Sequence, residues 1–253
     1  MYFNNEFCDL YFEKYGDGLD KLLILPGWGD NRNSFHHIID YFKDKYTIYI
    51  VDYPGFGKSS VPNFEMTIYN YATMIREFME EYSIENPTII AHSFGGRITI
   101  LLSGLYNVKI KKIVLIDVAG IKERKSLSQL IRQYTYKIRK HISIFIRNKD
   151  KRNNYLISLR KKYASSDYLM LPDTMHKTFK NIVNENLKKY IKNIKEEVLI
   201  LWGEYDFDTP LKSGIIFNKK IKDSALIILP RAGHFSYIEY RELSISIMDK
   251  FIG

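Results

Sequence analysis

Short apolar, β-branched runs alternate with helical patterns through the first 120 residues of the chain. Four of these runs predict strands that are buried on both faces, because they contain few polar positions and end in Gly, Pro, Asp or Ser. These strands are expected at 21–27, 46–55, 87–93 and 110–120. The segments between them carry apolar residues at helical spacing and predict helices at 30–44, 65–83 and 94–107.

The segment 65–83 shows the clearest helical period. Its apolar residues recur at i, i+3 and i+4, so one face is expected to pack on a sheet: Ile68, Tyr71, Ala72, Ile75, Phe78 and Met79. The alternation resumes near residue 196 with a strand, a helix after Pro210, a strand at 224–230 and a helix at 236–251. Repeated strand-helix units predict an α/β fold with a mostly parallel sheet and helices on both faces.

An insertion at 121–195 interrupts this alternation. It is rich in Lys, Arg and Tyr, has little strand character, and contains helical patterns, with apolar residues four positions apart at Leu130, Tyr134, Ile138 and Ile142. We therefore divide the chain into a core, residues 1–120 and 196–253, and a helical insertion, residues 121–195.

Charge sharpens this division. The chain carries a formal charge of +9, but residues 121–195 hold 20 Lys and Arg against 5 Asp and Glu, a net charge of +15. The remaining residues carry a net charge of −6, so the basicity belongs to the insertion.

The single cysteine, Cys8, excludes an internal disulfide and predicts a reducing compartment. The N-terminus does not resemble a secretory signal, and no run of 18 apolar residues occurs, so we expect a cytoplasmic location.

Reactive side chains cluster at the predicted strand ends. In a parallel sheet, groups that follow the strands meet at one edge, where ligands bind. The residues there include a serine, a histidine and several aspartates: Gly27, Trp28, Asp52, Ser93, Asp117, Asp206 and His234. A serine becomes a useful nucleophile when an imidazole takes its proton and a carboxylate orients that imidazole.

Three segments resemble the α/β-hydrolase family. "AHSFGG", "WGEYDFDTP" and "RAGHFSYIE" are similar to its nucleophile, acid and histidine segments, and they occur in the family's order. "LPGWGD" resembles its oxyanion loop, and "VDYPGFGKS" its DxxGxGxS stretch. The resemblance covers almost the whole chain. It implies an eight-stranded type of sheet flanked by helices, with the insertion as a helical cap whose apolar stripes face the substrate pocket.

The resemblance also implies roles for individual residues. Ser93 would attack an acyl carbon, His234 would act as general base and then acid, and Asp206 would orient the imidazole. Backbone N–H groups of Trp28 and Phe94 would form the oxyanion hole. Two other aspartates stay open as the acid, since Asp208 lies two residues beyond Asp206 and Asp117 ends an earlier strand.

Two departures from known motifs bear on these roles. Ala91 stands where GxSxG has its first glycine, and because alanine disfavours positive φ, we expect position 91 to stay extended at the end of its strand. "GFGKSS" lacks the first glycine of a phosphate-binding loop, since Asp52 occupies that position. We expect neither a cofactor nor a metal site.

The resemblance makes a serine hydrolase of a carboxylic ester or thioester, acting through an acyl-enzyme, our leading hypothesis. C–C bond hydrolases and biosynthetic ester hydrolases remain alternatives on the same fold, as does a non-catalytic protein that binds a small molecule. The basic insertion fits a solvated outer face or a contact with an anionic substrate. A membrane surface is open but not favoured, nucleic acid is disfavoured because no recognition motif is present, and the oligomeric state is left open.

Overall fold

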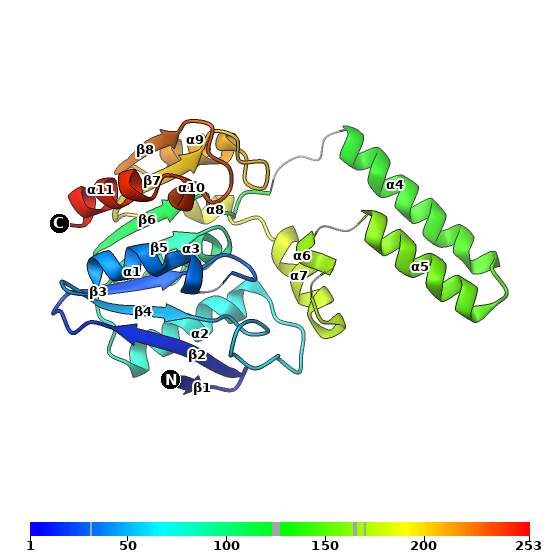
Figure 1. Ribbon diagram of the computed structural model, residues 1–253, viewed down its shortest axis with the longest axis horizontal. Coiled ribbons are helices and arrows are strands. Elements are labelled where there is room, and N and C mark those ends of the chain that lie inside the picture. The colour runs from blue at the N-terminus through cyan, green and yellow to red at the C-terminus, as the bar shows by residue number, and fades with distance from the viewer. Residues whose placement is uncertain (31, 123–126, 164–165, 170) are drawn as a thin grey trace.

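The central feature of the fold is a sheet of eight strands in the order β1-β2-β4-β3-β5-β6-β7-β8 (Figure 1). The computed structural model describes residues 1–253 except 31, 123–126, 164–165 and 170. All strand pairs from β4 to β8 are parallel, whereas β1 and β2 join the edge antiparallel. The strands are β1 Tyr2–Asn4, β2 Asp9–Tyr15, β3 Lys21–Leu25, β4 Thr47–Val51, β5 Thr88–His92, β6 Lys112–Ile116, β7 Glu197–Gly203 and β8 Ser224–Leu229.

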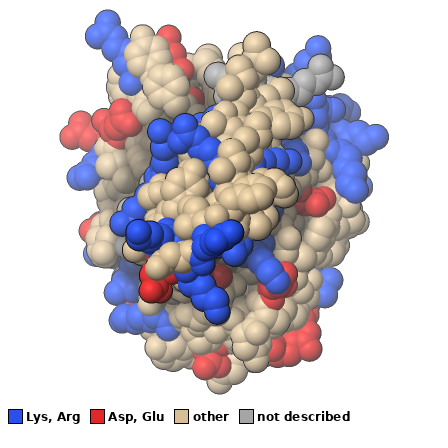
Figure 2. Space-filling model, turned by 90° about the vertical axis from the view of Figure 1, so that its right-hand side faces the viewer, with Lys and Arg blue, Asp and Glu red and all other residues tan. Residues whose placement is uncertain are grey.

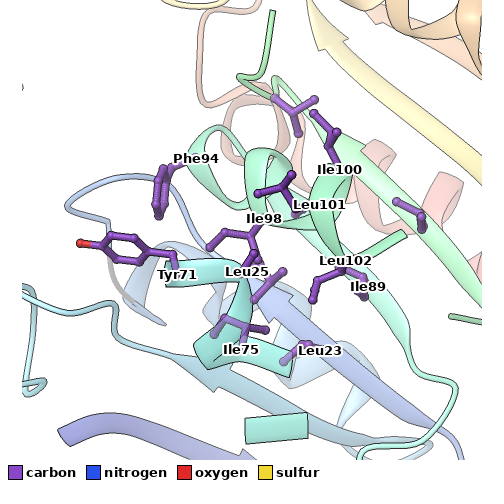
Figure 3. Close-up of a cluster of buried hydrophobic side chains, with 14 of the residues drawn as sticks. Leu23, Leu25, Tyr71, Ile75, Ile89, Phe94, Ile98, Ile100, Leu101 and Leu102 are labelled. Carbon is purple, nitrogen blue, oxygen red and sulfur yellow. The ribbon is translucent and has the colours of Figure 1, made fainter. Parts of the chain in front are cut away.

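Helices cover both faces of this sheet, and alternate strand residues feed two separate cores. In β3, Leu23 and Leu25 join a core with α2 (Ile68–Glu81) and α3 (Phe94–Gly104), as Figure 3 shows. Leu22 and Ile24 face the opposite core, which contains apolar residues of α1 (His36–Phe42) and α11 (Arg241–Ile252). The mostly parallel sheet flanked by helices is therefore confirmed.

Helix α2 forms where the helical period predicted it. The Thr67 hydroxyl accepts a hydrogen bond from the backbone N–H of Asn70, and the Asn70 side chain accepts one in return from Thr67 N–H. This reciprocal cap satisfies backbone donors that an α-helix leaves open at its N-terminus. The face expected to pack on the sheet is buried throughout.

The described residues between β6 and β7 form helices joined by loops, with no strand among them. Helices α4 and α5 form a hairpin that projects from the sheet layers in Figure 1, and η2 lies between them. The elements of this segment are α4 Leu127–Ile142, η2 Ser143–Phe145, α5 Lys149–Tyr163, α6 Ser166–Leu169, η3 Asp173–Met175, α7 His176–Asn184 and α8 Lys188–Ile191. The remaining elements are η1 Arg32–Phe35, α9 Leu211–Lys220 and α10 Ser236–Glu239.

The C-terminal part of this segment is attached to the core by polar and apolar contacts. The buried Thr178 hydroxyl of α7 accepts a hydrogen bond from the backbone N–H of Met66, 3.0 Å away. The guanidinium of Arg97 in α3 donates to the carbonyl oxygen of Glu185. Leu187 and Ile191 are buried in the same core as α2 and α3. These contacts hold α7 and α8 beside the sheet, independently of the α4–α5 hairpin.

None of the described helices is long and apolar enough to cross a membrane.

Candidate active site

A serine, a histidine and an aspartate meet at the carboxyl edge of the sheet. Ser93 follows β5, Asp206 lies in the loop after β7, and His234 lies in the loop after β8. Nε2 of His234 is 2.9 Å from the hydroxyl oxygen of Ser93, and Nδ1 of the same ring is 2.8 Å from Oδ2 of Asp206. The structure thus joins the three predicted residues in one chain of hydrogen bonds.

Ser93 sits on a sharp turn between β5 and α3. Its φ of 47° and ψ of −108° are rare for a residue with a side chain, and such strain concentrates at functional sites. The backbone around it is fixed by neighbouring segments, because Ser93 N–H donates to Ile116 O and Ala119 N–H donates to Ser93 O. Ala91 is buried within β5 and pairs with Leu25, so it stays extended, as expected.

Two glycines after the serine allow this close packing. A Cβ at Gly95 would collide with the carbonyl oxygen of Leu25, and one at Gly96 would collide with the side chain of Val118. Gly95 N–H also donates to the carbonyl oxygen of Pro26. The turn therefore requires its smallest residues on the helix side, whereas an alanine fits on the strand side.

Asp206 is held in place by Thr209 as well as by His234. The Thr209 hydroxyl lies 2.6 Å from Oδ2 of Asp206, and the backbone N–H groups of Asp208 and Thr209 donate to Oδ1. Burial raises the pKa of Asp206, but hydrogen bonds from His234 and Thr209 outweigh it and leave the pKa below its ordinary value. Asp206 is therefore ionised at neutral pH. The contact of Thr209 with Asp206 could not be predicted from the sequence, in which Thr209 is only one position of "WGEYDFDTP".

The other two candidate acids lie differently. The Asp208 side chain is exposed, while its backbone supports Asp206. Asp117 is fully buried with φ of 47°, and its carboxylate accepts hydrogen bonds from Gly203 N–H and from the N–H and hydroxyl of Ser236. Burial raises the pKa of Asp117 to about 7, against the opposing effect of these hydrogen bonds. Asp117 thus ties the ends of β6 and β7 to the loop that carries His234.

We expect Asp117→Asn to lower stability rather than abolish turnover. The amide NH₂ would face donors now satisfied by a carboxylate, which should reduce the free energy of unfolding by about 1–3 kcal/mol. Turnover by the folded fraction should fall by less than about tenfold, because Asp206 still accepts the hydrogen bond from Nδ1–H of His234. Urea denaturation and ester hydrolysis measure the two effects. A loss of about 10⁴-fold at unchanged stability would instead make Asp117 the acid.

Burial and the neighbouring Asp206 shift the pKa of His234 in opposite directions. Burial disfavours its protonated form, but the hydrogen bond and charge of Asp206 outweigh burial and raise the pKa above its ordinary value of 6.5. A second histidine supports its backbone, since Nε2 of His92 lies 2.8 Å from the carbonyl oxygen of His234. Burial lowers the pKa of His92 to about 3, so this ring is neutral and donates its Nε2 proton. The contact between His92 and His234 could not be foreseen from the sequence.

Trp28 and Phe94 flank the serine from two segments. Phe94 is the first residue of α3, and the N–H groups of a helix's first turn have no partner within the helix. The Trp28 ring packs edge-on against Phe94, with centroids 4.9 Å apart, and it also contacts Phe56 and Phe179. The loop after β3 is thereby fixed next to the start of α3.

Two other strand-end residues serve the scaffold. Asp52 accepts a hydrogen bond from Lys58 N–H and so holds the loop after β4. Gly27 leaves room for His92, since a Cβ there would lie 3.0 Å from Nδ1 of that ring.

Among the described residues, Asp206, Asp208 and His234 also bring ligand-type atoms within 4.8 Å of one another. Asp206 and His234 are hydrogen-bonded to each other and the Asp208 side chain is exposed, so we assign no metal to the three.

The sheet order, the strained serine turn and the Ser-His-Asp arrangement define a hydrolase of the α/β class. A family model described as "alpha/beta hydrolase fold" matches residues 21–240. The chain belongs to this family and is an α/β-hydrolase enzyme.

Similar proteins include esterases and related hydrolases. A pimeloyl-[acyl-carrier protein] methyl ester esterase of Wigglesworthia glossinidia brevipalpis is 27% identical, over 94% of this chain and 95% of the relative. A 2-hydroxy-6-oxononadienedioate/2-hydroxy-6-oxononatrienedioate hydrolase of Paraburkholderia phymatum is 23% identical, over 96% and 91%. The crystal structure of MGS-M2, an α/β-hydrolase enzyme from a deep-sea metagenome library, superposes with a TM-score of 0.76 at 20% identity, covering 100% of this chain and 97% of that one.

Proposed function

We propose that the protein cleaves carboxylic esters or thioesters through an acyl-enzyme formed on Ser93. The observation that carries this proposal is the pair of hydrogen bonds that links Ser93, His234 and Asp206 at 2.9 and 2.8 Å. An imidazole placed between a hydroxyl and an ionised carboxylate can accept the hydroxyl proton as the nucleophile attacks.

The proposed reaction has two halves. Nε2 of His234 takes the Ser93 proton while Oγ bonds to the acyl carbon, and the resulting oxyanion accepts hydrogen bonds from the backbone N–H groups of Trp28 and Phe94. The imidazolium, stabilised by Asp206, then gives its proton to the departing alcohol or thiol. Water, deprotonated by His234, hydrolyses the acyl-enzyme and restores the serine.

We also propose that residues 121–195 form a cap over a core made of 1–120 and 196–253. Contacts of the elements around α7 with loops next to the serine support this arrangement. The ring of Phe179 in α7 lies 5.6 Å from the Trp28 ring, and the Met175 side chain at the start of α7 occupies the space where Gly55 lacks a Cβ. Substrate would then lie between α7 and Ser93, with the acyl group against this apolar cluster.

The relatives favour an ester of a carboxylic acid as substrate, because the esterase from Wigglesworthia aligns along nearly the whole chain. Hydrolysis of a C–C bond is the second candidate, and the relative from Paraburkholderia supports it over a similar length. Both reactions can use the same triad, so the distinction depends on the pocket and not on Ser93.

The half-buried thiol of Cys8 is compatible with the cytoplasm, where we place the enzyme.

A fluorophosphonate probe combined with a substrate panel tests this function. We expect the probe to label Ser93 covalently, as read by peptide mass spectrometry, and to block hydrolysis of p-nitrophenyl esters. The panel should include acyl-CoA thioesters and a 2-hydroxy-6-oxo dienoate. Turnover of the dienoate alone would favour the C–C candidate. A folded sample that is neither labelled nor active on any member would refute the enzyme mechanism.

A further inference from the structure

Helix α4 of the projecting hairpin carries an apolar stripe that no other part of the described structure covers. Five residues of the helix, spaced three or four positions apart, form one face, and each side chain is more than half exposed. We call these the apolar stripe: Leu127, Ile131, Tyr134, Ile138 and Ile142. The sequence predicted that apolar stripes of this segment face a substrate pocket, whereas the stripe of α4 faces solvent.

The stripe does not stabilise the hairpin itself. Helix α4 contacts α5 through its opposite face, where the Tyr136 and Tyr163 rings lie 5.7 Å apart. The Arg132 guanidinium donates to the carbonyl oxygen of Lys162 and lies over the Tyr163 ring. Tyr136 lies two positions from both Tyr134 and Ile138, about half a helical turn around from the stripe. The stripe therefore points away from α5.

The stripe continues into the turn at the far end of α4. Ile144 is more than half exposed, and Phe145 is 79% exposed, in the short helix η2 between α4 and α5. Figure 1 shows this turn at the end of the hairpin farthest from the sheet. An exposed phenylalanine at a projecting tip is suited to insertion between lipid headgroups.

Positive charge surrounds the stripe. Residues 127–163 contain 11 Lys and Arg and a single acidic residue, Asp150, for a net charge of +10. Lys137 and Arg139 border the stripe on its two sides by helical position. Figure 2, which faces this end of the molecule, shows Lys and Arg side chains around a band of uncharged atoms.

We propose that the α4–α5 hairpin docks the enzyme on an anionic phospholipid surface. The apolar stripe and Phe145 lie in the interface, and the flanking cations meet lipid phosphates. A second copy of the chain is a poorer occupant, because two hairpins of net charge +10 would repel each other. An acidic protein would satisfy the cations, whereas a lipid interface supplies phosphates for the cations and an apolar layer along the whole length of the stripe.

Vesicle binding by the full chain tests the proposal without any measurement of turnover, so its outcome is independent of the proposed function. We expect binding to mixed phosphatidylcholine and phosphatidylglycerol vesicles to be at least about tenfold tighter than binding to pure phosphatidylcholine vesicles, and to weaken as salt is added. Cosedimentation measures both effects. Equal binding to the two vesicle types, or none, would overturn the proposal.

Variants separate the two parts of the surface. Ile138→Ser combined with Phe145→Ser should weaken binding at least about tenfold, whereas Leu19→Ser, which changes a leucine 99% exposed on the core, should not. Lys137→Gln with Arg139→Gln should reduce the salt dependence, unlike the control pair Lys212→Gln and Lys222→Gln. Circular dichroism verifies that each variant is folded. Unchanged vesicle binding by the stripe variant would refute lipid docking. Self-association that depends on the stripe, in the absence of vesicle binding, would refute it as well.

Discussion

Ser93→Ala is expected to lower ester turnover by at least about 10³-fold, and by as much as about 10⁶-fold if the acyl-enzyme carries the whole reaction. Alanine cannot form the covalent intermediate, while the oxyanion donors, which belong to the backbone, stay in place. Residual hydrolysis above the rate in water should therefore persist. Steady-state kinetics with p-nitrophenyl esters measures the loss, and fluorophosphonate labelling should disappear with it.

Ser103→Ala is the matched control for this variant. Ser103 is a buried serine in the same helix, α3, and its hydroxyl donates to Glu196 rather than to the triad. We expect this change to cost some stability and to leave labelling of the serine turn intact. A Ser93→Ala enzyme that keeps turnover within about tenfold of the unchanged protein would show that Ser93 is not the nucleophile.

Asp206→Asn is expected to lower turnover by about 10⁴-fold, because an amide no longer fixes the tautomer of His234 that can accept a proton at Nε2. Asp208→Asn is the control two residues away. The Asp208 side chain is exposed and its backbone N–H, which bonds to Asp206, is unaffected by the change. We expect less than a tenfold effect from Asp208→Asn, and the reverse order of the two variants would assign the acid to Asp208.

The pH dependence of kcat/KM distinguishes a direct effect of Asp206 on His234 from a merely structural role, which would leave this pH dependence unchanged. Only the neutral imidazole of His234 can accept the serine proton, so turnover falls as pH drops through its pKa, which lies above 6.5. In Asp206→Asn, the burial that lowers this pKa remains while the carboxylate that raises it is gone. The acid limb of kcat/KM should therefore move to lower pH. A limb that does not move would contradict the contact seen between Asp206 and His234.

Most of the parallel part of the fold could be predicted from sequence because its inner strands are buried on both faces and so form apolar runs. The edge strands could not. In β2, the buried Leu10 and Phe12 alternate with the less buried Asp9, Tyr11 and Glu13, and β1 is only three residues long, so neither forms an apolar run. Tertiary pairing across β1, β2 and β4 decides these elements.

The grouping of Ser93, Asp206 and His234 could be predicted from motif order, but the contacts that support these residues could not. His92 and Thr209 lie inside the nucleophile and acid segments, but neither position has a role of its own in these motifs. Only the folded geometry reveals their contacts with His234 and Asp206. The exposure of the α4 stripe was missed for a similar reason. Helical periodicity identifies an apolar face, but it does not say what that face meets.

The uneven placement of charge gives the molecule a large permanent electric dipole. The hairpin segment 127–163 has a net charge of +10, and the whole chain has a net charge of +9. The residues outside the hairpin are therefore close to neutral, with a net charge of −1. The basic isoelectric point near 9.3 is thus a property of one projecting element. In an external field, or on a cation-exchange matrix, the enzyme should align with the hairpin foremost and its sheet trailing.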